Sequence, residues 1–251
     1  PYVFAMSNLS DQRVALMKNL PFVSVIVPTY HDWGRLRLCL DALHGQTYHP
    51  ERFEVLVVNN APNDLPPYKV AMGNVRLLEE TKPGSYAARN TAIRVAKGDI
   101  FAFTDSDCIP TSTWLVEATS LLISGHDRVG GVITLKFQSD QLTWAELYES
   151  VYAFPQEKYV EMGFGATANM LAKRRCFDYI GLFDESLLSG GDFEWGKRAD
   201  QAGLSLRILQ GADPVQGREW KSPKRPALRD RREVLPRAHD HLGGQGHHPG
   251  G

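Results

Sequence analysis

Three apolar stretches of similar style recur in the first half of the chain, each short and rich in β-branched or aromatic residues. They read VSVIVPTY from residue 23, FEVLVVNNAP from residue 53 and DIFAFTDSD from residue 99. Apolar runs of this length predict buried strands, and each run ends in polar or turn-forming residues. The pattern therefore predicts three core strands that all end in polar side chains.

Helical periodicity separates these strands. In DWGRLRLCLDALHGQ the residues Leu36, Leu40 and Leu43 fall at i, i+4 and i+7, which is one face of a helix. In SYAARNTAIRVAKGD we predict Ser85 as the N-cap and Gly98 as the C′ residue that ends the helix. Its apolar face is expected to comprise Ala88, Ala92, Val95 and Ala96. Alternating strands and helices predict an α/β fold, a mainly parallel central sheet flanked by helices.

Beyond residue 110 the pattern predicts a helix in TWLVEATSLLIS, one strand in VGGVITLKF and a helix in LTWAELYESVYAF. From ANMLAK to LRIL it predicts a strand, a short helix, a turn, a helix ending at Gly203 and a last strand. We accordingly divide the chain into an N-terminal extension, 1–20, a single domain, 21–209, and an atypical tail, 210–251. The tail holds five of the 15 prolines and seven of the 22 glycines, with little apolar periodicity, which predicts disorder.

Composition narrows the class of protein. The 251 residues are 43% hydrophobic and 23% charged, with a formal net charge of −1, which argues against a nucleic-acid partner. The cysteines, Cys39, Cys108 and Cys176, lie far apart without the spacing of a disulfide scaffold or a zinc site, and this fits a reducing cytosol. No apolar run approaches the ~20 residues that a membrane-spanning helix requires.

The stretch IFAFTDSDCIP, residues 100–110, runs from an apolar strand directly into two aspartates. Ligands of parallel sheets bind at the carboxyl ends of the strands, so Asp105 and Asp107 are expected at the mouth of a site. Two such carboxylates offer hard oxygen ligands to Mg²⁺ or Mn²⁺. The alternative is a solvated turn in which one aspartate caps the following helix. The apolar residues on both sides of the pair favour the site.

Four pieces, in order, resemble the family 2 glycosyltransferases. They are VSVIVPTY, VLVVNNAP, GSYAARNTAIRVAKGDIFAFTDSDCIP and GLFDESLLSGGDFEWGKRADQAG, and the resemblance covers residues 21–209. It implies a single Rossmann-like nucleotide-diphosphosugar transferase domain of the GT-A type. It also implies an inverting, metal-dependent, hexosyltransferase-type enzyme, with Mg²⁺ or Mn²⁺ as cofactor. Such an enzyme moves a sugar from a nucleoside-diphosphate sugar to an acceptor hydroxyl.

Residue by residue, the resemblance implies that the nucleotide sugar is bound by Pro28, Thr29, Tyr30, Asn59, Asn60, Lys82, Arg89 and Asp105. Asp105 and Asp107 are implied as the metal ligands. At Asn59 and Asn60 the family more often has aspartates that touch uracil. An amide can also pair with a base edge, so the choice of base stays open. An ordinary solvated cation is an equal alternative for Lys82.

The general base is sought in SGGDFEWGKRA, where the family places an acidic pair or a single acid at the start of a helix. Gly191 stands in place of the first acid, and Asp192 is implied as the base that takes the proton of the acceptor hydroxyl. Glu194 is the reserve candidate. The alternative for Asp192 is an N-cap, because an aspartate after two glycines is a favoured cap.

The acceptor side is implied to lie near an aromatic stretch, Trp144, Tyr148, Tyr152, Phe154, Tyr159 and Phe164. Aromatic residues at helical spacing are more often core, and that alternative is favoured. The resemblance implies a glycan or lipid-linked acceptor and a role in polysaccharide or cell-surface glycan synthesis. It further implies a cytoplasmic location, with peripheral association at the inner face of the membrane.

Two other functions are weighed. A non-catalytic or truncated sugar-nucleotide-binding remnant is suggested by Gly191 and by the atypical tail. A sugar-1-phosphate nucleotidyltransferase requires a glycine-rich, arginine-bearing loop after the first strand, where this chain has PTYHDWGRL.

The tail bears on the metal site. In the family a histidine after the last strand completes that site, but the sequence from Gln210 has no Val-x-His. A divergent tail and a reading-frame error explain this equally well. His239 or His241 would replace the missing histidine only if the tail folds back over the strand ends.

Overall fold

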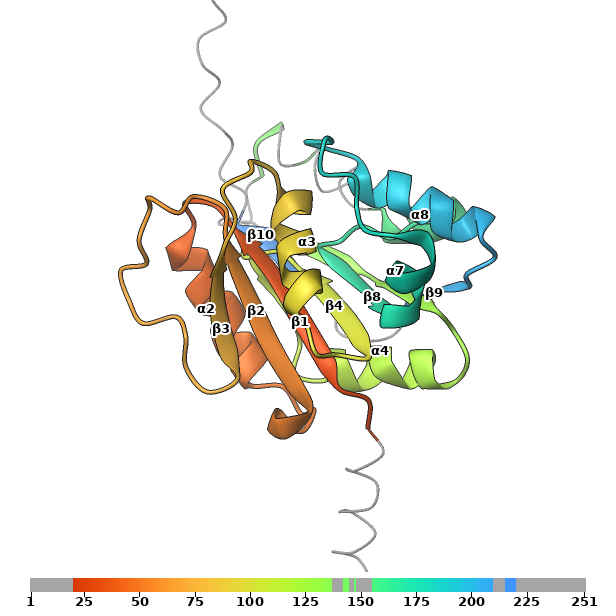
Figure 1. Ribbon diagram of the computed structural model, residues 1–251, viewed down its shortest axis with the longest axis horizontal. Coiled ribbons are helices and arrows are strands. Elements are labelled where there is room, and N and C mark those ends of the chain that lie inside the picture. The colour runs from red at the N-terminus through yellow and green to blue at the C-terminus, as the bar shows by residue number, and fades with distance from the viewer. Residues whose placement is uncertain (1–19, 137–141, 145–146, 148–154, 210–214, 220–251) are drawn as a thin grey trace, which may run out of the picture. The chain divides into compact units, whose positions relative to one another are not determined.

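The computed structural model describes residues 20–136, 142–144, 147, 155–209 and 215–219, all within one compact unit (Figure 1). The described helices are α2 (Trp33–His44), α3 (Ser85–Val95), α4 (Trp114–Ile123), α6 (Gln156–Glu161), α7 (Arg174–Ile180) and α8 (Gly191–Gln201), with the 3-10 turn η1 (Pro50–Arg52). The strands are β1 (Val23–Thr29), β2 (Phe53–Asn59), β3 (Val75–Glu79), β4 (Ile100–Thr104), β5 (Cys108–Ile109), β6 (Arg128–Gly131), β7 (Ile133–Lys136), β8 (Asn169–Lys173), β9 (Leu206–Leu209) and β10 (Val215–Glu219).

The main sheet has seven strands in the order β3-β2-β1-β4-β8-β6-β9. The pairs from β3 to β4 are parallel, and β8 is antiparallel to both of its neighbours, β4 and β6. β9 pairs with β6 in parallel, so β8 alone runs against the other strands of this sheet. The predicted mainly parallel α/β sheet is confirmed.

Helices cover both faces of this sheet, because its central strands are buried on both sides. Along β1, Val25 and Val27 pack in one apolar cluster with residues of α2 and α4, whereas Ile26 packs in the other with residues of α3, α7 and α8. The side chains of a strand alternate between faces, so this division gives a three-layer arrangement. Leu36, Leu40 and Leu43 are buried in the first cluster, as predicted.

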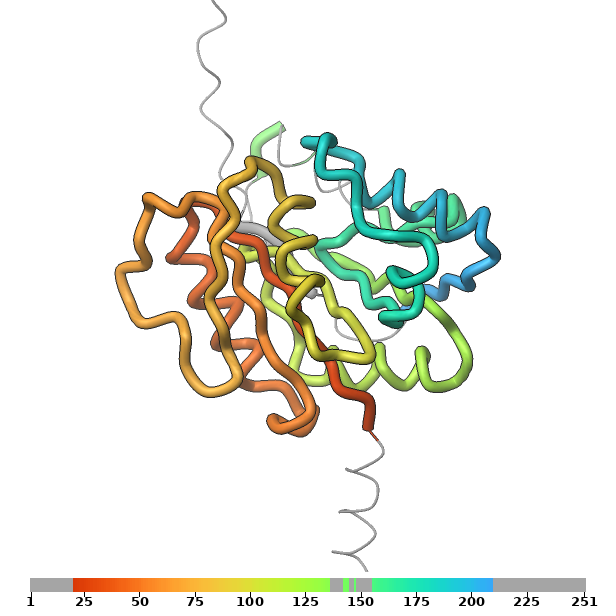
Figure 2. Tube along the Cα trace, viewed as in Figure 1, coloured from red at the N-terminus to blue at the C-terminus, as the bar shows by residue number. Residues whose placement is uncertain are grey.

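The carboxyl ends of β1, β2 and β4 lie at one edge of the sheet, where α3 begins. Figure 2 shows the chain crossing the sheet along β1 and returning to this same edge before α3. The polar residues that follow each strand are therefore brought together, as the pattern of strands and helices predicts.

Three local predictions are corrected by the structure. β3 was not predicted, because Arg76 and Glu79 interrupt the apolar pattern of this edge strand. VGGVITLKF forms two strands in different sheets, β6 and β7, with a break at Val132. Val95, expected on the apolar face of α3, is 42% exposed.

Both predicted helix-end residues of α3 are also corrected. The N-cap is Gly84, with φ 120°, so Ser85 is the first helical residue, and the C-cap is Ala96. Gly98 has a different role. A Cβ atom on Gly98 would lie 2.5 Å from the backbone nitrogen of Ser24, so glycine is required there for close packing against β1.

A second, three-stranded sheet has the order β5-β10-β7. β10 lies within the tail that was expected to be disordered, and it pairs with β5 in antiparallel and with β7 in parallel orientation. The edges of the short strands β5 and β7 offer unpaired backbone groups, and β10 pairs with these groups. Backbone pairing of this kind needs no apolar pattern in the sequence of β10, so the sequence did not predict it. The other tail residues, including His239 and His241, lie outside the described part of the chain.

Candidate active site

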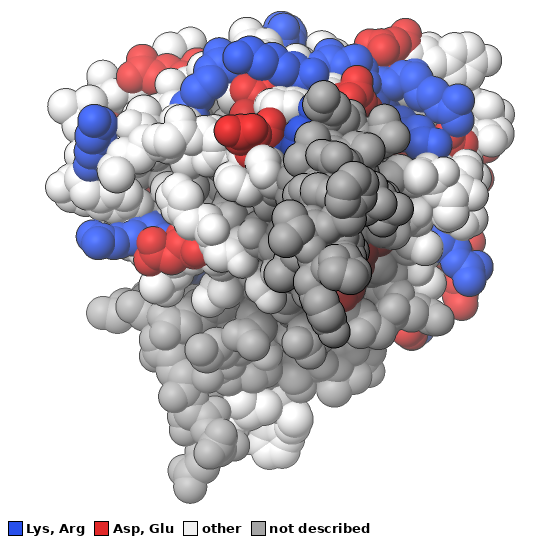
Figure 3. All heavy atoms as spheres, turned by 90° about the horizontal axis from the view of Figure 1, so that it is seen from below, with Lys and Arg blue, Asp and Glu red and all other residues white. Residues whose placement is uncertain are grey.

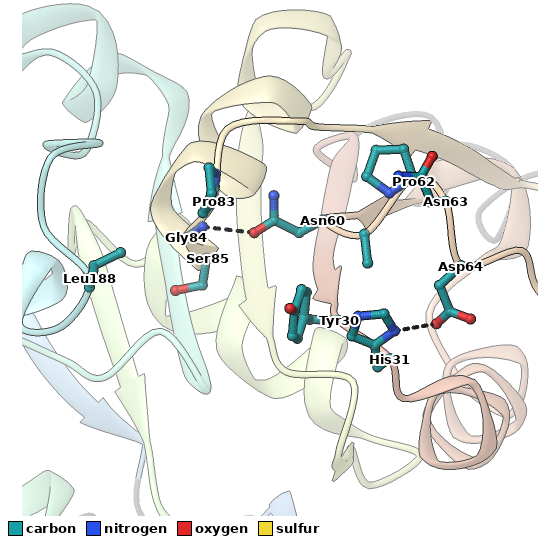
Figure 4. Close-up of a pocket in the computed structure, with 11 residues that line it drawn as sticks. Tyr30, His31, Asn60, Pro62, Asn63, Asp64, Pro83, Gly84, Ser85 and Leu188 are labelled. Atoms are coloured by element: carbon teal, nitrogen blue, oxygen red, sulfur yellow. Dashed lines mark hydrogen bonds and ion pairs between the residues drawn. The ribbon is translucent and has the colours of Figure 1, made fainter.

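A pocket of about 850 Å³ opens at the carboxyl ends of β1 and β2, beside the start of α3 (Figure 4). Its volume falls in the range of small-molecule sites, ~300–1,000 Å³. The lining residues come from the end of β1, the loop after β2, the turn before α3 and the loop before α8, and are Tyr30, His31, Asn60, Ala61, Pro62, Asn63, Asp64, Pro83, Gly84, Ser85 and Leu188. Two of the residues predicted to bind the nucleotide, Tyr30 and Asn60, are among them.

One wall of the pocket is built around Asp64, which the sequence analysis missed. Its carboxylate lies 2.8 Å from His31 Nδ1 and accepts a hydrogen bond of 3.0 Å from Trp33 Nε1. His31 has a φ of 52°, a left-handed conformation that is uncommon for residues other than glycine. Tyr30 is 66% exposed, and its ring meets the His31 ring edge-on at 4.3 Å. A charged residue in the Pro/Asn-rich loop after a buried strand was the available signal.

The amides of Asn59 and Asn60 hold the loops of the pocket. Asn60 donates to the carbonyls of Glu80 and Lys82 at 2.9 and 2.8 Å, and its oxygen accepts from the Gly84 N–H at 2.8 Å. Asn59 is 1% exposed; it donates to a carbonyl and accepts from an N–H within the loop after β2. Donor and acceptor of each amide thus have backbone partners, a role that the sequence analysis did not foresee.

The start of α3 faces the pocket. Gly84 is the N-cap and supplies no side chain to cap the helix, and Pro83, Gly84 and Ser85 all line the pocket. Backbone N–H groups at such a helix terminus, together with the helix dipole, favour an anion. Lys82, predicted beside the diphosphate, instead directs its ammonium group to Glu185 at 3.0 Å.

The two aspartates after β4 each meet an arginine. Asp105 accepts a hydrogen bond from Arg89, whose side chain is 3% exposed. Asp107 lies 3.6 Å from Arg35, which is 41% exposed. The N-cap position of the helix that follows is Thr113, so the alternative in which an aspartate caps it is wrong. Both carboxylates stand at the strand ends, where the sequence predicts a site.

A divalent cation suits the chemistry of this carboxylate pair. Burial raises the pKa of the Cys39 thiol, and the negative charges of Asp105 and Asp107 raise it further. The pKa of the buried Cys108 thiol is raised by burial and by the same two charges. Within the described residues, no group of three or more His, Cys, Asp and Glu side chains could hold a metal. Mg²⁺ commonly binds through one or two carboxylates plus substrate phosphates, so two carboxylates fit.

Buried polar atoms near this edge lack protein partners. The hydroxyls of Thr29 and Thr104, the last residues of β1 and β4, have no hydrogen-bond partner among the described residues, nor has Arg89 Nε. An unsatisfied buried polar group is uncommon and calls for a ligand, water or ion. Pro28 and Thr29, predicted to bind the nucleotide, are buried in β1 and do not line the pocket.

Asp192 stands in the first turn of α8, and three donors converge on its carboxylate. The Tyr86 hydroxyl donates to Oδ1 at 3.2 Å and the Phe193 N–H at 2.9 Å, while the Thr167 N–H lies 3.4 Å from Oδ2. The N-cap of α8 is Gly190, so the alternative interpretation of Asp192 as N-cap is wrong. Tyr86 belongs to α3, which links Asp192 to the Arg89–Asp105 pair one helical turn away.

Glu194, the reserve candidate, is held by an arginine of its own helix. Its two carboxylate oxygens accept hydrogen bonds from Arg198 at 2.6 and 2.9 Å. Arg198 also donates to the carbonyls of Ile180 and Leu182, which ties α8 to the end of α7. The arrangement gives Glu194 a structural partner that Asp192 does not share.

Part of the predicted aromatic stretch lies near Asp192. The Tyr159 and Phe164 rings stack at 4.6 Å, and Phe164 meets the Phe193 ring edge-on at 5.1 Å. Burial raises the pKa of Tyr159, and the charge of Asp192 adds to it. Trp144 is 88% exposed, whereas Tyr148, Tyr152 and Phe154 lie outside the described residues.

Figure 3 views the opposite edge of the sheet, where Lys and Arg side chains form a band along one border of the face. A few Asp and Glu side chains lie beside this band. None of the helices that the structure describes is both long and apolar enough to cross a membrane.

Comparison with known proteins identifies relatives of this chain. The model of a family described as Glycosyl transferase family 2 matches residues 24–181. Glycosyltransferase AglE of Haloferax volcanii is 37% identical over 199 residues, which cover 76% of this chain and 65% of AglE. Ten of the eleven residues that line the pocket, all except Leu188, lie within the region that the family model matches, as do both aspartates of the Asp-x-Asp pair.

Two solved structures share the fold. The mannosyltransferase PcManGT from Pyrobaculum calidifontis, in complex with GDP-Man and Mn²⁺, superposes with a TM-score of 0.58 at 23% identity over 84% of this chain. Residues 1–349 of S. aureus TarS give 0.54 at 20% identity over 76%. This chain covers 59% of the length of each of these two structures and 65% of the length of AglE. The GT-A type architecture expected from the sequence is confirmed.

Proposed function

Since this chain belongs to glycosyl transferase family 2, we propose that it moves a sugar from a nucleoside-diphosphate sugar to an acceptor hydroxyl. The transfer is metal-dependent and inverts the anomeric carbon. One observation carries this proposal, a continuous run of contacts from Asp105 through Arg89 and Tyr86 to Asp192. It holds carboxylates from two distant segments of the chain beside one helix terminus.

The donor nucleotide occupies the pocket at the ends of β1 and β2. The exposed Tyr30 ring offers a face on which a base can stack, and Asp64 offers an acceptor for a base N–H. The diphosphate lies at the start of α3, where the uncapped N–H groups of the helix favour negative charge. Asn60 contributes by fixing the turn that presents these groups.

Asp105 and Asp107 hold Mg²⁺ or Mn²⁺ in this proposal, and Arg89 orients the Asp105 carboxylate. When bound, the cation supplies Lewis-acid stabilisation of the negative charge that develops on the leaving diphosphate. PcManGT was solved in complex with GDP-Man and Mn²⁺, which supports a divalent metal and a nucleotide sugar for the same fold.

Asp192 acts as the general base. Its carboxylate removes the proton of the acceptor hydroxyl as the acceptor oxygen bonds to the anomeric carbon. The bond from that carbon to the phosphate oxygen breaks at the same time, so the nucleoside diphosphate leaves with the bonding electrons. Attack from the face opposite the leaving group inverts the configuration, and no sugar–enzyme bond forms. Glu194 is less suited because Arg198 occupies both of its oxygens.

The acceptor side is assigned to the region around Asp192, and the acceptor is a glycan or a lipid-linked sugar of polysaccharide or cell-surface glycan synthesis. The Tyr159 and Phe193 rings near Asp192 offer apolar faces for a sugar ring. Peripheral association with an anionic cytoplasmic membrane surface is supported by the band of Lys and Arg side chains in Figure 3.

A donor panel tests this function. The full chain is incubated with UDP-, GDP- and dTDP-sugars and candidate acceptors, with Mn²⁺ or with a chelator, and release of nucleoside diphosphate is measured. We expect release from at least one donor, and its loss in chelator. Donor binding without release from any donor would favour the sugar-nucleotide-binding remnant. Formation of nucleotide sugar from a sugar 1-phosphate and a nucleoside triphosphate would favour the nucleotidyltransferase.

A further inference from the structure

Gly191 lies where the chain has no room for a side chain. A Cβ atom on Gly191 would lie 2.7–2.9 Å from three atoms of the Tyr86 ring. Gly191 is not among the glycines with positive φ, so its backbone does not require glycine. The requirement is one of space, and the Tyr86 ring fills that space.

The Tyr86 ring is fixed between α3 and α8. Tyr86 is 5% exposed, and its ring packs against the Phe183 ring at 5.6 Å. The Arg89 guanidinium lies 5.5 Å from the centre of the same ring. With the ring held on these sides, its hydroxyl reaches Asp192 Oδ1 at 3.2 Å. The other described donors to Asp192 are the backbone N–H groups of Phe193 and Thr167.

We propose that Tyr86 is the positioning residue for Asp192, and that Gly191 serves to admit its ring. The inference rests on the proposed role of Asp192 as general base. The phenol O–H fixes the direction of one carboxylate oxygen and leaves the second to face the acceptor hydroxyl. The Tyr86 ring, which comes from α3, therefore occupies the space that a side chain at position 191 would otherwise fill. Position 191 is the neighbour of the proposed base.

Charge around the pair keeps the phenol a donor. Burial raises the pKa of Tyr86, and the negative charge of Asp192 raises it further, while a hydrogen bond from the Asp192 backbone and then the charge of Arg89 act in the opposite direction. Among the described groups with a shifted pKa, Tyr159 of α6 is the other one that the charge of Asp192 affects, and its pKa is also raised. A neutral phenol donating to a carboxylate is a charge-assisted hydrogen bond, which is stronger than one between neutral groups.

The first test is Tyr86→Phe, which removes the hydroxyl and keeps the ring. We expect kcat to fall roughly tenfold, the scale of one hydrogen bond to a charged group, while donor KM and donor affinity stay within about twofold. The matched control is Tyr179→Phe, the same change on α7 at a tyrosine that is 72% exposed, and it should leave kcat unaltered. An unchanged kcat in Tyr86→Phe would overturn the inference.

A second test concerns the space between Gly191 and the Tyr86 ring. Gly191→Ala places a methyl group against the Tyr86 ring and should lower kcat at least as far as Tyr86→Phe does. In a Tyr86→Ala background the same methyl group meets no ring, so adding Gly191→Ala should cost little further activity or thermal stability. Residues in contact give such non-additive effects. Fully additive losses would contradict the pairing.

A titration supplies a readout that needs no turnover. The phenol resonance of Tyr86, identified by its disappearance in Tyr86→Phe, is followed by NMR against pH. In Asp192→Asn the carboxylate charge is gone, so the phenol pKa should fall relative to the wild type. An identical phenol pKa would overturn the contact itself.

The outcomes separate this inference from the proposed function. If Asp192→Asn abolishes turnover while Tyr86→Phe leaves kcat unchanged, Asp192 remains the base and the positioning role of Tyr86 is wrong. If Asp192→Asn turns over like the wild type, the base assignment fails, and the role of Tyr86 fails with it.

Discussion

The two sides of the site use their polar side chains in different ways. On the donor side, Asn59 and Asn60 direct their amides to the backbone, and the pocket presents a helix terminus framed by loops. On the acceptor side, donors from α3, α8 and the turn before β8 converge on a single carboxylate, Asp192. In the proposed function, the first side is a hydrogen-bonded frame whose shape matters, and the second is a reactive group whose orientation matters. Mutations should therefore weaken donor binding on the first side and turnover on the second.

The largest expected effect tests the acceptor side. Asp192→Asn removes the proposed general base, so kcat should fall roughly 100- to 10,000-fold, with little change in donor affinity. The matched control is Glu194→Gln, two residues on in α8, which should leave kcat nearly unchanged and lower the melting temperature because it weakens the Arg198 pair. If Glu194→Gln is the more damaging change to kcat, the base assignment is wrong.

The next effect concerns Asp107, a proposed metal ligand between the donor side and the acceptor side. Asp107→Ala should lower metal-dependent turnover roughly 100- to 1,000-fold, because the proposed site would lose a ligand of the cation that would stabilise charge on the leaving diphosphate. The fold should persist, since the change removes a carboxylate at the strand ends, and circular dichroism checks this. Undiminished activity of the mutant, or of the wild type in chelator, would show that the transfer does not depend on a metal.

A smaller effect tests the donor frame. Asn60→Ala removes three hydrogen bonds to the turn before α3, so the free energy of unfolding should fall by about 2–3 kcal/mol. Donor affinity should fall roughly tenfold, because the helix terminus is no longer held in place. Calorimetry measures both quantities. The control is Asn63→Ala, a change in the same pocket wall. Equal losses in the two variants would show that the hydrogen bonds of Asn60 do not hold the helix terminus in place.

The smallest effect concerns acid stability. A hydrogen bond from Asn90, followed by those from Lys82 and Arg94, lowers the pKa of Glu185 from 4.5 to about 2. The lowered pKa means that Glu185 stabilises the fold above pH 4.5 and loses this contribution as pH falls toward 2. Thermal unfolding followed from pH 5 to 2 should show a shallower loss in Glu185→Gln than in the wild type. Parallel curves would show that Glu185 contributes nothing.

The sequence predicted most of the fold, because the strongest signals are local. The apolar runs of β1, β2 and β4 and the Leu36–Leu40–Leu43 face of α2 fix the three-layer core. The family resemblance rested on four pieces in order and is confirmed by the family match over residues 24–181. β3 escaped prediction because an edge strand needs few apolar residues.

The contacts between the side chains of the site were not predictable from the sequence. Asn60 meets partners 20 to 24 residues away, and Tyr86 meets Asp192 across 106 residues. No periodicity or spacing encodes such pairs, since they arise only when the strand ends are brought together. Gly191 illustrates the limit. In the sequence, Gly191 stands where the family has an acidic residue. In the structure, the Tyr86 ring occupies the space beside Gly191 that a side chain would need.

Asp192 as the general base requires a direct displacement at the anomeric carbon, so the anomeric configuration of the product distinguishes this mechanism from one with a sugar–enzyme bond. NMR of the product formed from the active donor gives this configuration. We expect inversion, so that a donor with an α-linked phosphate yields a β-linked product. Retention of the donor's configuration would contradict it.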